Sequence, residues 1–211
     1  MPKPSATARA RKIKLILFDV DGVLTDGKIW IFPAPSVGQQ SGAQQSLLQK
    51  SATHGAQGGF GLHSASQIEA KGFHAHDGTA ISLARLAGIK TGIITKRISE
   101  TVALRARDLK MDHVYQGIQD KASVFAQILE KNGITAAEAA FVGDDVIDLP
   151  AMRKCGLAIA VKNGRPEVKA EAHLVTSHAG GDGAARDAVE YILKAQGKWK
   201  RVVEEYISER L

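Results

Sequence analysis

Two aspartates spaced two residues apart stand in the segment of the chain that is richest in chemistry. Asp19 and Asp21 follow the apolar run Leu15–Phe18, and Gly22 comes next. This spacing places both carboxylates on the same side of an extended segment. One can attack phosphorus and form an aspartyl-phosphate, while the other protonates the leaving oxygen and later activates water. The pair predicts a phosphomonoesterase site, although Asp-x-Asp-Gly alone also fits a polar turn after a strand.

A second acidic cluster favours the catalytic interpretation. Asp144, Asp145 and Asp148 follow another apolar run. Acids that converge on one crevice repel one another unless a cation neutralises them. Oxygen ligands at a phosphate site favour Mg²⁺, which also screens an anionic nucleophile from an anionic ester. The two clusters together predict a magnesium-dependent phosphatase.

Phosphoryl transfer also needs a hydroxyl and a fixed cation near the transferring group. Thr95 ends an apolar run and can supply the hydroxyl, and Lys121 begins a helical segment and can supply the ammonium. Each has an ordinary explanation when taken alone. A threonine at a strand end usually caps a turn, and a lysine in a first helical turn is usually solvated.

The elements that must position these residues alternate between strand and helix. Apolar runs predict strands at 15–18, 89–94, 113–115, 139–142, 157–161 and 173–175, and helical patterns follow Gly78 as far as 87 and occupy 99–109, 121–132 and 184–195. This order predicts an α/β fold, a Rossmann-like open parallel sheet with helices on both faces. Such sheets bind ligands at the carboxyl ends of their strands, where Asp19, Thr95 and Asp144 fall.

A single domain is expected from 211 residues, of which 44% are hydrophobic. We expect a basic disordered tail at 1–11 and the phosphatase domain at 12–211. Glycine, glutamine, serine and alanine dominate at about 33–66, which predicts a low-complexity insertion. The segments on either side, 28–32 and 68–74, are expected to form the arms of a β-hairpin flap after the first strand.

The net charge of +6 is concentrated at the amino terminus, where five Lys or Arg residues occur among the first fourteen without an acid. No nucleic-acid partner is expected, because Glu204 and Glu205 offset the basic residues at 198–201 near the other end. The single cysteine, Cys155, excludes an intramolecular disulfide. No apolar run is long enough for a signal peptide or a membrane span, so we expect no membrane partner and a cytoplasmic location.

The chemical motifs resemble those of the haloacid dehalogenase superfamily. Four matching segments occur in the family's order: DVDGVLTD at 19–26, Thr95, Lys121, and GDDVID at 143–148. By this resemblance, Mg²⁺ is held by Asp19, the main-chain carbonyl of Asp21, and Asp144. Asp145 and Asp148 order its waters or Lys121. Thr95 and Lys121 bind the phosphoryl group.

Further segments are similar to a capless branch of the superfamily that dephosphorylates sugar-acid phosphates. They are LTDG at 24–27, FH at 73–74 with DG at 77–78, HVYQG at 113–117, GGDGA at 180–184 and AQGKW at 195–199. The resemblance implies 3-deoxy-D-manno-octulosonate 8-phosphate, a lipopolysaccharide precursor, as the substrate, with a nine-carbon sialic-type 9-phosphate as the alternative. It also implies a homotetramer in which the hairpin and a neighbour's carboxyl-terminal tail cover the crevice.

The predicted substrate-binding residues include one departure from the family pattern. Lys96 stands where the family usually has glycine between Thr95 and Arg97. Lys96 either contacts substrate or points to solvent, which leaves Arg97 to bind the ester or the sugar carboxylate. Asp77, Gly78 and Arg186 complete the predicted set, and Arg186 can bind a carboxylate bidentately, although a surface contact is the commoner role of such an arginine.

His76 is a second departure, because an arginine often precedes the Asp-Gly pair in the family. A metal site at His74 and His76 is disfavoured, since the sequence suggests no third ligand nearby. Together with Lys96 and the insertion, His76 leaves open an alternative function in which the chain is a non-catalytic assembly domain that keeps the fold.

Overall fold

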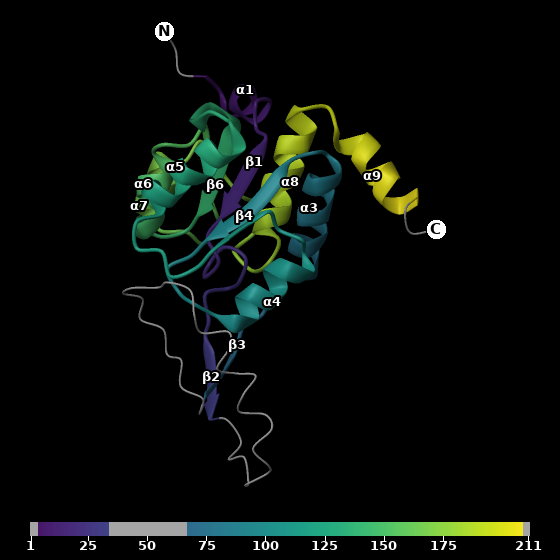
Figure 1. Cartoon of the computed structure of the whole chain (residues 1–211). Helices are drawn as coiled ribbons and strands as arrows, with labels where there is room; N and C mark the ends of the chain where they lie inside the picture. Colours follow the sequence, from purple (N-terminus) through teal and green to yellow (C-terminus); the bar gives the residue numbers. More distant parts are fainter. Residues whose placement is uncertain (1–3, 34–66, 209–211) are drawn as a thin grey trace.

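The computed structural model describes residues 4–33 and 67–208, so nearly all of the predicted insertion at 33–66 lies outside the described residues. Within that part, a six-stranded sheet has the order β5-β4-β1-β6-β7-β8, and every neighbouring pair is parallel (Figure 1). The strands are β1 (Leu15–Phe18), β4 (Lys90–Ile94), β5 (His113–Tyr115), β6 (Ala139–Gly143), β7 (Leu157–Ala160) and β8 (Leu174–Val175).

Helices cover both faces of this sheet, which confirms the predicted α/β fold (Figure 1). Leu15 and Leu17 of β1 face one hydrophobic core, and Ile16 and Phe18 face the other, as the alternation of side chains along a strand requires. The first core packs under α5 (Lys121–Asn132), α6 (Leu149–Met152) and α7 (Pro166–Glu171). The second packs under α1 (Ala6–Ala10), α3 (Ala75–Leu86), α4 (Glu100–Asp108), α8 (Ala184–Ala195) and α9 (Trp199–Ser208).

The amino-terminal segment corrects the prediction of a disordered tail at 1–11 for the residues described. Ala6–Ala10 form a short helix, and the Ser5 hydroxyl caps it by accepting from the Ala8 amide. Ala10 is fully buried, and the Arg9 guanidinium donates to the Gly156 carbonyl at 2.7 Å. An alanine-rich sequence with a serine cap favours a helix, and docking onto the core fixes it.

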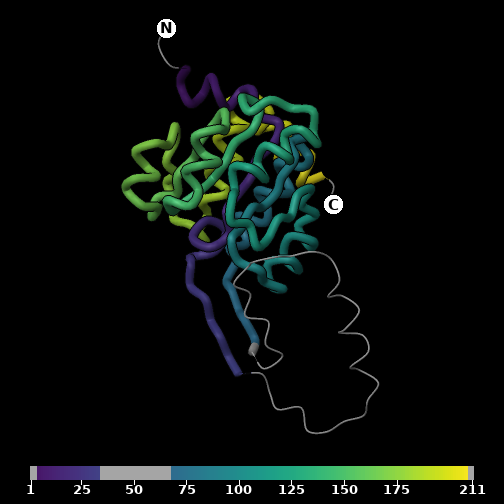
Figure 2. Tube along the Cα trace, turned by 60° about the vertical axis from the view of Figure 1, so that its left-hand side comes forward, coloured from purple at the N-terminus to yellow at the C-terminus, as the bar shows by residue number. Residues whose placement is uncertain are grey.

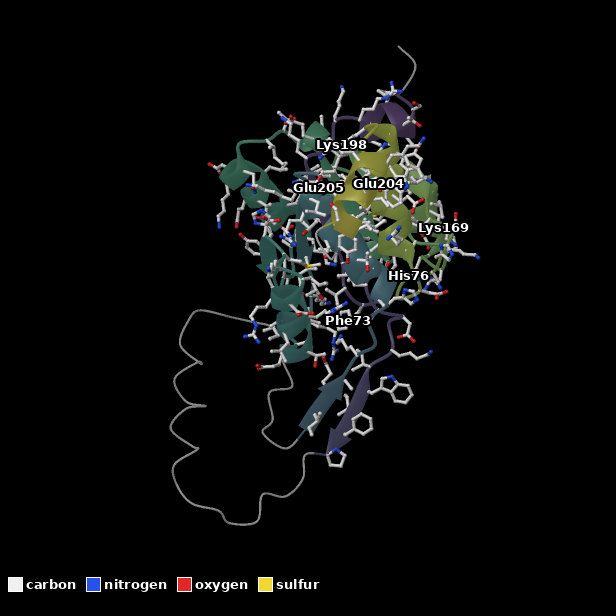
Figure 3. The ribbon with its side chains drawn as sticks, turned by 90° about the vertical axis from the view of Figure 1, so that its right-hand side faces the viewer. Phe73, His76, Lys169, Lys198, Glu204 and Glu205 are labelled. Carbon is white, nitrogen blue, oxygen red and sulfur yellow. The ribbon has the colours of Figure 1, made fainter. Side chains whose placement is uncertain are left out.

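A two-stranded antiparallel ribbon extends away from the body of the molecule (Figure 2). It pairs β2 (Trp30–Pro33) with β3 (Gln67–Ala70), and Trp30 lies opposite Ala70. Phe73 lies where the ribbon joins the body, and it packs against the second core (Figure 3). The two paired strands agree with the predicted hairpin arms, while the role of the ribbon as a flap stays a prediction. Among the described residues, no helix is long and apolar enough to cross a membrane.

Candidate active site

The predicted site residues follow three adjacent strands. Asp19 comes after β1, Thr95 after β4 and Asp144 after β6, and β1 lies between the other two in the sheet. Parallel strands end at one edge of the sheet, so these residues share that edge. Asp19 and Thr95 are buried, and Asp144 is partly buried. The Thr95 Oγ1 accepts from the Arg97 amide at 3.4 Å.

Lys121 joins the first acidic segment to the second. Its Nζ lies 2.9 Å from Asp19 Oδ1 and donates to Asp148 Oδ1 at 2.6 Å. Lys121 is the first residue of α5. The side chain of the neighbouring Asp120 caps this helix, which fixes the position of the Lys121 backbone. Burial alone would lower the pKa of Lys121, but the charges of Asp19 and Asp148 raise it above its ordinary value. The ammonium therefore stays charged in the buried site.

Asp148 also shapes the loop after β6. Its Oδ2 accepts from the amide of Asp144 at 3.0 Å and from that of Asp145 at 3.4 Å, and its side chain is fully buried. The Asp145 Oδ1 accepts from the Val146 amide at 2.7 Å and caps a short 3₁₀-helix, Val146–Asp148. Both carboxylates thus support the loop that presents Asp144.

The electrostatics of this cluster call for a cation. Asp19, Asp144 and Asp148 each offer a carboxylate oxygen, and these atoms lie within 4.8 Å of one another. Burial, followed by the charge of Asp148, raises the pKa of Asp19 to about 7. Burial, followed by the charge of Asp19, raises the pKa of Asp144 to about 7. Three carboxylates facing one ammonium leave two excess negative charges when ionised.

A divalent metal ion fits this donor set. The Asp144 Oδ1 is buried and has no hydrogen-bond partner among the described residues. A buried, unpartnered carboxylate oxygen is costly unless a cation binds it. The donors are all oxygen atoms, which suit a hard cation such as Mg²⁺.

Glycine is needed beside this cluster. Gly22 has φ +94°, a left-handed conformation, and a Cβ at this position would collide with the Asp144 carboxylate. The loop at Gly180 packs directly against the Gly22 carbonyl, and the Gly181 amide donates to the Val23 carbonyl at 3.0 Å. The glycine-rich segment at 180–183 therefore packs against the first acidic loop and supports it.

Asp21 lies between two cations that come from distant segments. The ammonium of Lys71 pairs with Asp21 Oδ1, and the Nε of Arg97 lies 3.8 Å from Asp21 Oδ2. Arg97 also donates to Glu69 at 3.1 Å, whereas Lys96 is exposed. Sequence analysis did not single out Lys71 or Glu69. Their only signal was their place within the predicted hairpin arm at 68–74.

The other predicted substrate-binding residues have different contacts. Asp77 accepts from the amides of Gly183 and Arg186 at 3.3 and 2.9 Å, and so caps the start of α8. Gly78 lies against the Arg105 side chain, and the Arg186 guanidinium lies 4.9 Å from the centre of the Trp199 ring. None of these contacts involves a residue of the acidic cluster. Their roles in substrate binding stay predictions.

Comparison with known proteins identifies the family. A model of the haloacid dehalogenase-like hydrolase family matches residues 91–186. The 3-deoxy-D-manno-octulosonate 8-phosphate phosphatase KdsC of Escherichia coli (strain K12) is 36% identical over 191 residues, which cover 90% of this chain and 85% of that protein.

Solved structures are similar over nearly the whole chain. One is the 3-deoxy-D-manno-octulosonate 8-phosphate phosphatase of Moraxella catarrhalis in complex with magnesium, phosphate and KDO, with a TM-score of 0.76, 31% identity, and coverage of 95% of this chain and 97% of that one. Another is the cobalt-bound deoxy-D-mannose-octulosonate 8-phosphate phosphatase (YrbI) of Haemophilus influenzae, with a TM-score of 0.71, 30% identity, and coverage of 90% and 93%.

These relatives confirm the predicted phosphatase class, and the metal ions in their structures agree with the acidic triad described above. The order of the motifs, the parallel sheet and the full-length similarity all lead to one assignment. This chain belongs to the haloacid dehalogenase-like hydrolase family.

Proposed function

We propose that this chain is a Mg²⁺-dependent phosphomonoesterase that forms an aspartyl-phosphate at Asp19, and that its substrate is 3-deoxy-D-manno-octulosonate 8-phosphate. The observation that carries the proposal is the buried contact of Lys121 with both Asp19 and Asp148, next to Asp144. A nucleophilic carboxylate, a fixed ammonium and a metal-binding acid in one place are the parts that phosphoryl transfer needs.

In the first step, a carboxylate oxygen of Asp19 forms a bond to phosphorus while the bond from phosphorus to the ester oxygen breaks. Asp21 donates a proton to that departing oxygen, and the sugar acid leaves as an alcohol. Lys121 and the Thr95 hydroxyl bind the phosphoryl oxygens and offset their charge. The phosphate is then attached to Asp19.

In the second step, water attacks the phosphorus atom of the aspartyl-phosphate. Asp21, now ionised, takes a proton from this water, and the bond from phosphorus to Asp19 breaks. Inorganic phosphate leaves, Asp19 returns as a carboxylate and Asp21 is again protonated. The cycle consumes one ester and one water and produces one alcohol and one phosphate.

Three groups are assigned to the metal ion in this proposal: the Asp19 carboxylate, the main-chain carbonyl of Asp21 and the Asp144 carboxylate. A bound Mg²⁺ neutralises the excess negative charge, so that an anionic ester can approach an anionic nucleophile. Both oxygens of Asp148 already accept hydrogen bonds within the protein, which supports a role next to the ligands. Asp145 has the same supporting role as a cap of the loop.

The relatives support the proposed substrate. The Escherichia coli protein is a phosphatase of 3-deoxy-D-manno-octulosonate 8-phosphate, and the Moraxella catarrhalis structure holds KDO with magnesium and phosphate. Arg97 is partly buried beside Asp21 and is assigned to the ester or the sugar carboxylate, while exposed Lys96 is assigned to solvent. Asp77, Gly78 and Arg186 complete the proposed surroundings of the substrate.

A homotetramer is part of the proposal. Four large apolar side chains of the ribbon are at least 48% exposed, which supports burial against other copies of the chain: Trp30, Ile31, Phe32 and Ile68. Sedimentation of the purified protein tests this directly. A monomer at micromolar concentration would contradict it.

A substrate panel tests the function. Phosphate release is measured with Mg²⁺ for 3-deoxy-D-manno-octulosonate 8-phosphate, a sialic-type 9-phosphate and common hexose phosphates. The eight-carbon ester is expected to have the highest kcat/KM, and Asp19→Asn is expected to hydrolyse none. A preference for the nine-carbon ester would reassign the substrate. No turnover of any ester by the wild type would favour a non-catalytic assembly domain.

A further inference from the structure

Lys71 is a buried cation whose partner belongs to the proposed catalytic machinery. Its side chain is fully buried, and its ammonium pairs with Asp21 Oδ1 and lies 3.9 Å from Glu69 Oε1. An ammonium removed from water is strongly destabilising unless a carboxylate compensates it. Pairing with Asp21 therefore fixes the position of the buried Lys71 ammonium.

Glu69 fixes the backbone segment that carries Lys71. The Ser99 hydroxyl donates to Glu69 Oε1 at 2.5 Å, and the Arg97 guanidinium donates to Glu69 Oε2 at 3.1 Å. The Thr101 hydroxyl donates to the Glu69 main-chain carbonyl at 3.1 Å. These bonds attach the end of β3 to the start of α4, and Figure 1 shows these two ends next to each other.

The result is a group of four alternating charges that includes the Asp21 carboxylate. Lys71 contacts one of its oxygens and Arg97 faces the other, while Glu69 contacts both cations. A charged hydrogen bond from Lys71 on one side and the charge of Arg97 on the other restrict rotation of the Asp21 carboxylate. A general acid must meet its proton acceptor at hydrogen-bond distance, so a fixed orientation directly affects proton transfer.

We propose that Lys71 is a positioning residue for Asp21, held in place by Glu69. This inference rests on the proposed function, in which Asp21 protonates the leaving oxygen. Lys71 keeps the Asp21 carboxylate turned toward that oxygen, and the ribbon contributes to catalysis because β3 ends directly before Lys71. Without the ammonium, the Asp21 side chain rotates more freely and protonation of the leaving group slows.

The dependence on the leaving group separates this role from a general structural one. A p-nitrophenolate leaves without protonation, whereas the alkoxide of a sugar ester needs a proton. Lys71→Met keeps a long unbranched side chain but removes the charge. We expect it to lower kcat/KM for the sugar-acid phosphate about 10–100-fold, and to change kcat/KM for p-nitrophenyl phosphate less than about threefold. The ratio kcat/KM reports the first step, in which the leaving group departs, and so excludes the hydrolysis of the aspartyl-phosphate that both esters share.

Lys28→Met is the matched control, because Lys28 lies just before the other arm of the ribbon and its side chain is 70% exposed. This variant is expected to retain the wild-type kcat for both substrates. Lys71→Arg retains a cation and is expected to recover part of the activity toward the sugar-acid ester. Circular dichroism and thermal melting of every variant establish that it is folded.

Equal losses of kcat/KM for both esters would overturn the inference, since a positioning role for the general acid predicts unequal losses. A rise in KM with kcat unchanged would also overturn it, because Lys71 would then bind the substrate directly. If Lys71→Met does not fold, Glu69→Gln provides the same test. We expect a smaller loss of kcat/KM that is confined to the sugar-acid ester, and equal losses for both esters would overturn the inference. Wild-type protein that hydrolyses neither ester would instead refute the proposed function.

Discussion

Lys121 and Asp148 form a buried ion pair in which Nζ and Oδ1 are 2.6 Å apart. The pair connects the first residue of α5 to the loop after β6, and the same ammonium reaches Asp19 after β1. Three segments far apart in the sequence are thereby held at one sheet edge. The arrangement is structural and catalytic at once, because the residues that fix the loops also carry the charges of the site.

Removal of this ammonium should reduce both stability and activity. Lys121→Met leaves the buried Asp19 and Asp148 without their cation, and breaking a buried pair destabilises by about 3–5 kcal/mol. Activity should fall by about 10²-fold or more, as for other lost charge-stabilising groups. Urea unfolding and phosphate release measure the two effects. Lys131→Met changes an exposed lysine of the same helix and should alter neither stability nor activity. A decrease of less than about 1 kcal/mol in the unfolding free energy of Lys121→Met would contradict a buried ion pair of this importance.

Mg²⁺ should stabilise the protein more as pH rises. Asp19 and Asp144 keep their protons up to pH about 7 in the metal-free folded state, against a pKa of 3.8 for the ordinary carboxyl. The folded state then binds more protons than the unfolded state, so metal-free stability falls as pH rises through this window. The metal competes with those protons for the same oxygens.

The measurement is the melting temperature with EDTA and with saturating Mg²⁺. The increase caused by Mg²⁺ should be several degrees larger at about pH 8 than at about pH 5. An increase of the same size at both values would show that these carboxylates do not hold the ion.

Gly22→Ala should weaken metal binding through a steric effect. The new Cβ meets the Asp144 carboxylate, and the left-handed backbone adds about 1–2 kcal/mol of strain. Gly88→Ala is the matched control, because Gly88 also has a positive φ, +75°, but a Cβ there has no heavy atom within 4 Å. Titration calorimetry should show at least about a tenfold loss of Mg²⁺ affinity in Gly22→Ala alone. Equal affinities in the two variants would exclude the steric mechanism.

Lys96 and Arg97 should differ sharply although they are neighbours. Arg97 is partly buried and bound to Glu69, whereas Lys96 is exposed. Arg97→Ala should raise KM for the sugar-acid phosphate about tenfold or more, and Lys96→Ala should change it less than about twofold. Arg97→Lys should restore little, since lysine lacks the planar fork. A large rise in KM in Lys96→Ala would assign the substrate contact to Lys96 instead.

Periodicity and motif order were enough to predict the sheet and the acidic cluster. The apolar run before Asp19 and the one before Asp144 are buried strands, and neighbouring parallel strands must end together. The bounds of α5 and α8 agree with the prediction because each has a regular apolar face, and α5 has a side-chain cap as well. Hydrophobic periodicity and helix caps can be read from the sequence because each depends on residues that are only a few positions apart.

Lys71 could not be predicted in this way. It pairs with a carboxylate fifty positions earlier, and only the pairing of β2 with β3 and the attachment of Glu69 to α4 bring it there. The helix at Ala6–Ala10 was missed for another reason, since its basic charge suggested solvation while its alanines and the Ser5 cap favoured a helix. For Asp77, a role in substrate binding came from resemblance, and only the folded structure reveals that its side chain caps α8.

In the proposed mechanism Asp19 carries the phosphoryl group during turnover. Rapid acid quenching of a reaction with radiolabelled sugar-acid phosphate and Mg²⁺ can detect this intermediate. Label should be bound to the wild-type protein and released by hydroxylamine, as expected for an acyl phosphate. It should be absent from Asp19→Asn and from samples with EDTA. Turnover by Asp19→Asn, or wild-type turnover whose only labelled product is free phosphate at every quench time, would contradict this mechanism.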